Sequence, residues 1–133
     1  MSHSYAQTHG LPFPQLPVVM IHPESNARAA SLLGLVDTGA DATLVPSAQL
    51  RAIGAEEIYR ASLRSHWGES RPVVVYLVDL QVAGHNLPGI EVIADEYSDA
   101  ILLGRNVLNR LILLLDGPVQ ETDVLTARRR RRQ

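Results

Sequence analysis

Asp37, Thr38 and Gly39 are the residues whose types and order best suit chemistry, because they directly follow the apolar pair Leu35 and Val36. A carboxylate at the end of a buried strand is costly unless it is hydrogen-bonded or paired. Gly39 allows a sharp backbone turn and leaves amide donors near the Asp37 oxygens, and Thr38 adds a hydroxyl on a stiff side chain. The tripeptide alone also fits an Asx turn capped by its own threonine, which is a common arrangement.

A second segment favours a catalytic role for Asp37 over a simple Asx turn. Residues 100–108 read Ala-Ile-Leu-Leu-Gly-Arg-Asn-Val-Leu, and they follow the Asp-Thr-Gly-Ala-Asp of residues 37–41. In this order the two segments closely resemble the retroviral-type (retropepsin-like) aspartic proteases and their cellular and bacterial relatives. The resemblance extends from about Leu16 to Leu115, and a cellular or bacterial member is expected. It implies that the first motif carries the catalytic aspartate and that the second wraps behind it.

The resemblance implies a role for each residue of the two motifs. Asp37 is the expected catalytic carboxylate, and Thr38 resembles the residue that cross-bonds two active-site loops beneath a pair of aspartates. Gly39 matches a position whose backbone contacts substrate. Asp41 and Arg105 resemble an ion pair that lies behind the site and braces a dimer.

Further residues are expected to line substrate pockets in a protein of this type. They are Ala40, Asp41, Trp67, Ile101 and Leu102. Trp67 lies near the tip of a hairpin that the family uses as a flap over the substrate. The alternative for Trp67 is simple packing within that hairpin.

The chain holds a single Asp-Thr-Gly sequence, so a second carboxylate must come from a partner. A twofold homodimer places Asp37 opposite Asp37, and the monomer is expected to be inactive. Two close carboxylates cannot both ionise cheaply, as is known for aspartic-protease dyads, so they share a proton around an attacking water. We therefore predict an endopeptidase that cuts extended peptides, with apolar residues flanking the cut and best activity at mildly acidic pH.

Two other functions remain open at this stage. A latent or inactive dimer of the same fold would serve as a peptide-binding or scaffold module, since fold does not guarantee function. The intact Asp37-Thr38-Gly39 argues against this, because a binding module has no need of a buried charge. The third alternative is an unrelated β-barrel with a chance motif.

The elements that must position these residues are mostly strands. Short Val-, Leu- and Ile-rich runs separated by glycine and proline predict an all-β, small closed barrel-like acid-protease fold. The flap hairpin is expected to have arms at about 59–65 and 73–82 and its tip at 66–69. Short helices are predicted over 48–53, capped by Ser47, and over 105–110.

The sequence also suggests how the chain is divided. Residues 1–15 are predicted to be an N-terminal arm, 16–118 the protease domain, and 119–133 an arginine-rich, disordered tail. The retroviral enzymes interleave both chain ends into an intersubunit sheet. Here the arm Leu11–Pro17 and the strand Leu111–Leu115 would take that role.

Composition excludes several classes of function. The chain has no cysteine, which rules out disulfides and thiolate chemistry, and its five histidines show no metal-ligand spacing, so neither metal nor cofactor is expected. Without Arg128–Arg132, seven arginines face fourteen acidic residues, and so acidic a body is a poor nucleic-acid binder. The first ten residues lack an apolar core and no run is long enough for a bilayer, so a cytoplasmic protein without membrane insertion is expected.

Overall fold

The computed structural model describes residues 2–8, 10–65 and 67–126. It confirms the predicted all-β class, with two short helices among the strands. The strands are β1 (Ser2–Ser4), β2 (Gln15–Ile21), β3 (Leu32–Val36), β4 (Thr43–Pro46), β5 (Glu57–Arg64), β6 (Ser70–Val82), β7 (His85–Asp95), β8 (Ile101–Leu103), β9 (Ile112–Asp116) and β10 (Glu121–Leu125). The helices are α1 (Ser47–Ala52) and α2 (Arg105–Leu108).

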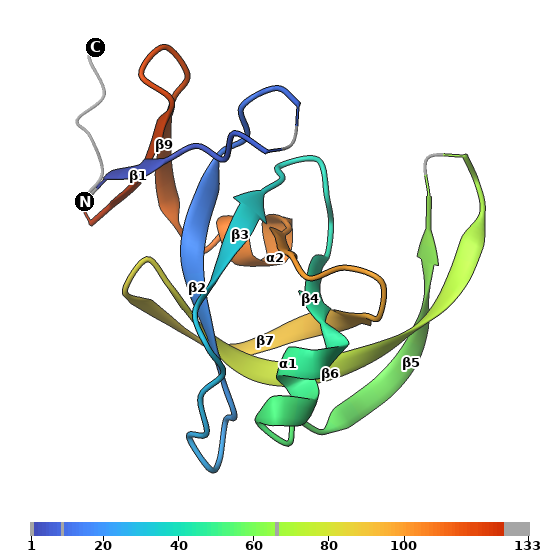
Figure 1. Cartoon of the computed structure of the whole chain (residues 1–133). Coiled ribbons are helices and arrows are strands. Elements are labelled where there is room, and N and C mark those ends of the chain that lie inside the picture. Colours follow the sequence, from blue (N-terminus) through green and yellow to red (C-terminus); the bar gives the residue numbers. More distant parts are fainter. Residues whose placement is uncertain (1, 9, 66, 127–133) are drawn as a thin grey trace, which may run out of the picture.

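Six of the strands close into a barrel (Figure 1). Their order is β2-β3-β8-β4-β7-β6, and β2 pairs back onto β6. Closure is possible because β2 changes partner along its length: Gln15–Val18 pair with β3 and Val18–Ile21 pair with β6. The strand begins at Gln15, within the segment predicted to be an extended arm. Pro17 is tolerated there although it has no amide to donate, and its carbonyl accepts the Ala83 N–H at 2.9 Å.

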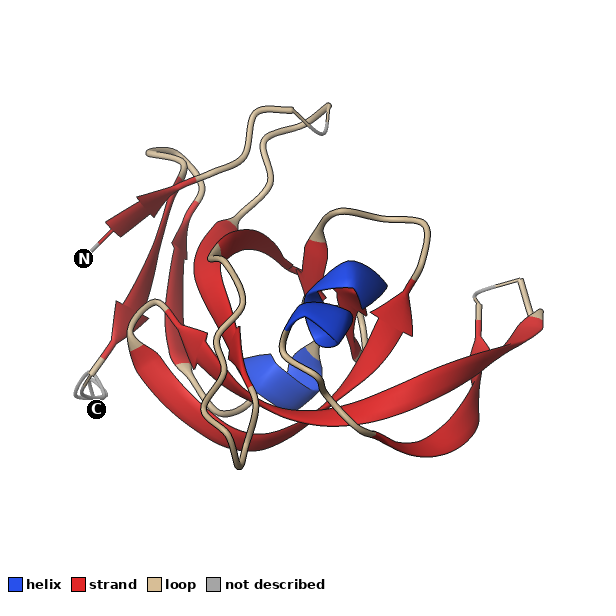
Figure 2. Ribbon diagram, turned by 60° about the horizontal axis from the view of Figure 1, so that its bottom comes forward, coloured by secondary structure: helices blue, strands red, loops and turns tan. Residues whose placement is uncertain are grey.

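Alternating apolar residues fill the barrel interior. Leu16, Val18 and Met20 of β2 point inward, because side chains one residue apart face opposite sides of a strand. α1 covers one opening of the core with the buried Leu50, and both helices lie against the strands in Figure 2. Ser47 is the first residue of α1 and not its cap, since the N-cap position is Pro46 and no side chain caps the helix. None of the described helices is long and apolar enough to cross a membrane.

β5 and β6 extend beyond the barrel as the predicted flap hairpin (Figure 1). β5 pairs only with β6, so it is the free edge of the seven-stranded sheet. Val73 and Val75 of β6 form a small second core with Ile93 of β7, against which Ala61 and Leu63 of β5 are packed. The hairpin is therefore held to the body by a few apolar contacts at its base.

The ends of the described chain form a separate three-stranded sheet in the order β1-β10-β9. The tail predicted from residue 119 is wrong for Glu121–Leu125, which form the central strand of this sheet. Asp116-Gly117-Pro118 does not end the fold but begins a tight reversal, in which the Asp116 side chain accepts the Val119 N–H at 3.2 Å. The polar-looking strand then buries alternate residues, Thr122 and Val124. Arg128–Arg132 lie outside the described residues.

The N-terminal arm is tied to the same sheet. Ser2–Ser4 pair with Asp123–Glu121, and the Tyr5 N–H donates to the Gln120 carbonyl at 2.9 Å. Ala6 forms an isolated bridge with Phe13. These terminal strands pair within one chain. The predicted intersubunit sheet stays a prediction.

Candidate active site

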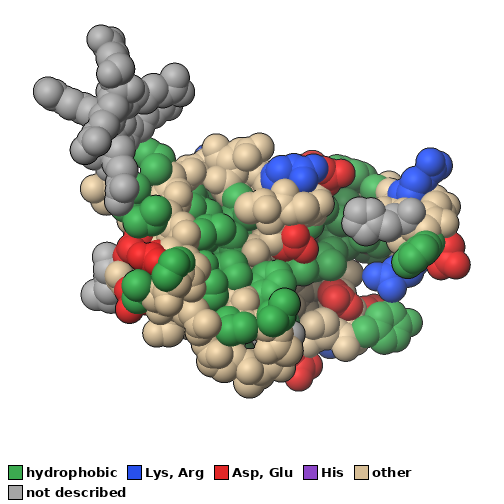
Figure 3. All heavy atoms as spheres, turned by 90° about the horizontal axis from the view of Figure 1, so that it is seen from above, with side chains coloured by type: hydrophobic (Ala, Val, Ile, Leu, Met, Phe, Trp, Pro, Cys, Tyr) green, Lys and Arg blue, Asp and Glu red, His purple; other side chains and the backbone are tan. Residues whose placement is uncertain are grey.

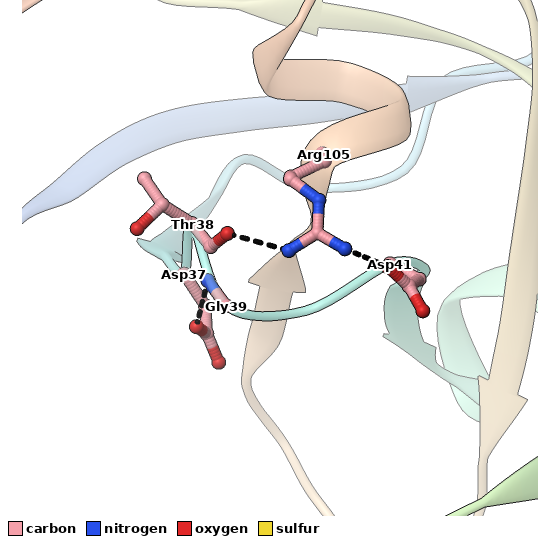
Figure 4. A network of polar contacts seen from close by, with 5 residues as sticks. All are labelled: Asp37, Thr38, Gly39, Asp41 and Arg105. Carbon is pink, nitrogen blue, oxygen red and sulfur yellow. Dashed lines mark hydrogen bonds and ion pairs between the residues drawn. The ribbon is translucent and has the colours of Figure 1, made fainter.

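Asp37 is the first residue after β3, and the backbone holds its carboxylate in place. The Asp37 N–H donates to the Leu103 carbonyl at 3.0 Å, which continues the parallel pairing of β3 with β8. One Asp37 side-chain oxygen accepts the Gly39 N–H at 3.0 Å, and the Ala40 N–H donates to the Asp37 carbonyl at 3.2 Å. The sharp turn thus aims one amide at the carboxylate, whose other oxygen accepts no hydrogen bond from the described residues (Figure 4).

Arg105 braces this turn from behind. Its guanidinium donates to the Thr38 carbonyl at 2.8 Å and forms an ion pair with Asp41, and its own N–H donates to the Ala40 carbonyl at 2.8 Å. Figure 4 shows the guanidinium between Thr38 and Asp41, the two sides of the turn. The sequence predicted the pairing of Asp41 with Arg105. The contact with Thr38 adds a direct link from α2 to the residue next to Asp37.

Gly104, directly after β8, lies very close to the backbone of Ala42, directly before β4. A Cβ at Gly104 would lie 2.2 Å from the Ala42 carbonyl oxygen, so no other residue fits without a backbone shift. The fully buried Thr43 hydroxyl accepts the Gly104 N–H at 3.1 Å and donates to the Asn106 side-chain oxygen at 2.7 Å. The motif after Gly104 therefore anchors the turn of residues 37–41 with both Arg105 and Asn106.

A cavity of about 650 Å³ opens in front of Asp37. Its lining combines the turn of residues 37–41, β4, β8 and the flap hairpin: Asp37, Gly39, Ala40, Asp41, Ala42, Leu44, Leu63, Arg64, Ser65, Trp67 and Leu102. Five of the eleven lining residues are alanine or leucine, and Asp37 is among the polar ones. The volume lies within the usual range of ligand-binding pockets.

Residues 26–110 match the family described as gag-polyprotein putative aspartyl protease, which is more than half of the chain. The chain belongs to this family. No curated protein is significantly similar in sequence.

Solved structures of retroviral proteases share the fold of this family member. EIAV protease bound to an inhibitor has a TM-score of 0.54 at 15% identity, covering 79% of this chain and 93% of that protein. The foamy viral protease-reverse transcriptase in complex with an RNA/DNA hybrid has a TM-score of 0.54 at 23% identity over 74% of this chain. The match spans only 12% of that longer viral protein.

Within this family fold, not every predicted pocket residue lines the cavity. Ala40, Asp41, Trp67 and Leu102 do, but Ile101 is fully buried in the barrel core. The reason is the alternation of β8: Leu102 faces the cavity, so its neighbours must face the other way. The Thr38 hydroxyl makes no hydrogen bond to the described part of the chain, so its expected cross-bond to a second loop stays a prediction.

The sequence missed other residues that line the cavity of this family member. Ala42 and Leu44 extend the alternation that Ala40 begins, and Leu63 belongs to the inner face of the hairpin. The spacing of every second residue from Ala40 could have predicted that Ala42 and Leu44 line the cavity. The described residues hold no group of three His, Asp or Glu side chains arranged for a metal ion.

Proposed function

We propose that this chain is one half of an aspartic endopeptidase, with Asp37 from each of two copies activating one water. The observation that carries the proposal is the Asp37 carboxylate, which accepts the Gly39 N–H and lines a cavity shared with the flap hairpin. One Asp37 activates the water as a base while the protonated partner Asp37 polarises the scissile carbonyl.

The face at the top of Figure 1 supports a twofold partner. The three-stranded sheet β1-β10-β9 (the terminal sheet) and the flap tip lie at opposite ends of this face, with the turn after β3 between them. Seen from above, hydrophobic side chains gather over the terminal sheet and toward the flap (Figure 3). Ile112, Leu115 and Val119 of the β9–β10 hairpin are exposed, although a lone chain gains nothing from exposing them. A second copy approaching this face would meet all three elements together.

The lining of the cavity supports a preference for apolar side chains beside the cut. Leu44, Leu63 and Leu102 present aliphatic surface beside Asp37. An extended peptide would lie between the catalytic turn and the flap, with its alternate side chains in these pockets.

The deciding experiment compares the purified protein with Asp37→Asn on a diverse peptide pool at about pH 5. Asparagine still accepts the Gly39 N–H, so the turn keeps its shape and only the charge is lost. We expect the variant to lose activity by about 10²–10⁴-fold or more. Equal product from both proteins would exclude Asp37 as the catalytic group.

Sedimentation of the same samples separates the remaining outcomes. If neither protein cleaves the pool and both sediment as folded dimers, the inactive peptide-binding module becomes the better proposal. For an active dimer, specific activity falls on dilution in parallel with the dimer fraction. Activity that stays proportional to chain concentration while the dimer dissociates would contradict a site shared between two copies.

A pH profile tests the shared proton directly. We expect activity to be highest at mildly acidic pH and to decline on both sides, because a dyad works only while it holds one proton. A profile that is flat from about pH 4 to about pH 9 would contradict this chemistry.

A further inference from the structure

Strand β5 of the flap hairpin has a polar tether to the body. The Tyr59 hydroxyl of β5 donates to a Glu91 carboxylate oxygen of β7 at 3.0 Å. Among the described residues, this is the only side-chain hydrogen bond that joins 57–65 to the rest of the molecule. Because β5 is a free edge strand, its position depends on its pairing with β6, on the packing of Ala61 and Leu63, and on this bond.

The bond runs diagonally across β6 on the inner face of the flap. Tyr59 lies opposite Val75, which lies opposite Ile93, and Glu91 is two residues from Ile93 on the same face. The ladder between β5 and β6 shifts register between Glu57 and Tyr59. Such bulges re-aim a side chain, and here the shift lies directly beside Tyr59.

Glu91 is also where a second chain of hydrogen bonds ends. Its backbone carbonyl accepts the Asn106 side-chain amide at 2.9 Å. Asn106 in turn accepts the Thr43 hydroxyl, which accepts the Gly104 N–H behind the catalytic turn. Glu91 therefore connects to the flap through its carboxylate and to the catalytic turn through its carbonyl.

We propose that Tyr59 and Glu91 are positioning residues that hold the flap hairpin at a fixed height over Asp37. The pair acts through the flap and touches no substrate. The part of the inference that concerns catalysis rests on the proposed protease function, whereas the part that concerns flap mobility does not. The hydrogen bond to Glu91 raises the pKa of Tyr59, and desolvation and the Glu91 charge raise it further.

Tyr59→Phe tests the proposal because it removes only the hydroxyl. The matched control is Tyr76→Phe on β6, since the Tyr76 hydroxyl makes no hydrogen bond to the described residues. Trp67 is the only tryptophan of the chain and lies near the flap tip, so its fluorescence anisotropy decay reports motion of the hairpin. We expect Tyr59→Phe to enlarge the fast component of the decay and Tyr76→Phe to leave it unchanged.

The kinetic consequence is a rise in KM. A flap that samples more positions must be ordered by each substrate, so KM for peptide is expected to rise about three- to tenfold in Tyr59→Phe with kcat nearly unchanged. If Tyr59 had a merely structural role, Tyr59→Phe would lower the folded fraction of the protein without raising KM at constant kcat. Tyr59→Phe and Tyr76→Phe that behave alike in both the fluorescence and the kinetics would overturn the proposal.

A double-mutant cycle of Tyr59→Phe with Glu91→Ala identifies the partner. We expect the second substitution to add nothing to the flap motion once the first is present, whereas additive effects would show that the two residues act separately. The anisotropy decay needs no turnover. If the wild-type protein proves inactive, the proposed function fails while the fluorescence still decides the role of the pair.

Discussion

The turn of residues 37–41 and the flap hairpin face the same cavity but are held in opposite ways. The turn is fixed by backbone bonds to β8 and α2, by the Arg105 guanidinium and by the close approach of Gly104. In the hairpin, β5 is a free edge whose described residues make one side-chain hydrogen bond to the body, and Trp67 near the tip is 91% exposed. Catalysis needs the carboxylate held within fractions of an ångström, whereas a cover must open to admit substrate. We therefore expect substitutions around residues 37–41 to be more damaging than substitutions in the hairpin.

The largest contrast is expected between two glycines. Gly104→Ala places a Cβ 2.2 Å from a backbone oxygen, so we expect a loss of more than about 3 kcal/mol of unfolding free energy or failure to fold. Gly68→Ala in the flap meets no atom within 4 Å and suffers only from its positive φ of 79°, a cost of about 1 kcal/mol. Urea denaturation measures both. Equal losses would show that the turn is not held more tightly than the flap.

The next contrast separates the two contacts of Arg105. Arg105→Met removes both the Asp41 ion pair and the bond to the Thr38 carbonyl, and we expect a loss of about 1–2 kcal/mol, discounted because the side chain is 43% exposed. Asp41→Asn removes only the ion pair, which is largely screened, and should cost less than about 1 kcal/mol. Urea denaturation of the two variants, with cleavage assays beside it, provides the comparison. A more damaging Asp41→Asn would show that the ion pair, and not the Thr38 contact, holds the turn.

A smaller effect on stability is expected at the flap tip. Trp67→Ala should change the free energy of unfolding by less than about 0.5 kcal/mol, because the side chain is almost fully exposed. If the tip covers bound peptide, KM rises in the same variant. Unchanged kinetics would show that Trp67 does not contact bound peptide. A large loss of stability would show that the Trp67 side chain packs within the hairpin.

The smallest effect concerns the tether itself and is visible by alkaline titration. The raised pKa of Tyr59 means that folding favours the neutral phenol, so this stabilisation is present below the ordinary tyrosine pKa. It is lost as the pH rises through the higher folded value. The difference in tyrosinate absorbance between the wild-type protein and Tyr59→Phe isolates the titration of Tyr59, and Glu91→Ala should lower its midpoint. A midpoint that Glu91→Ala leaves unchanged would argue against a formed bond.

The sequence was informative where short segments act alone. The paired motifs around Asp37 and Arg105 predicted the turn and its ion pair, and the continuous apolar run of residues 73–78 predicted the flap arm. Prediction failed for elements whose formation depends on residues far away in the sequence. The polar strand Glu121–Leu125 forms only because residues 112–116 and 2–4 flank it, and nothing local predicts that.

The same limit applies inside the site. Ile101 and Leu102 are equally apolar in sequence, and only the register of β8 against β3 shows which one faces the cavity. The bonds from Thr43 to Asn106 and from Tyr59 to Glu91 join residues 63 and 32 positions apart. Such pairs leave no trace in periodicity, because each member is an ordinary strand or helix residue on its own.

The small sheet at the chain ends has a consequence for biosynthesis. Ser2 pairs with Asp123, so β1 leaves the ribosome long before the strand that it needs. β10 lies between β1 and β9, and until it emerges both neighbours expose unpaired backbone edges of the kind that other chains can capture. A chain in which β10 has not yet been made would therefore expose both edges and would be more prone to aggregation than the folded protein.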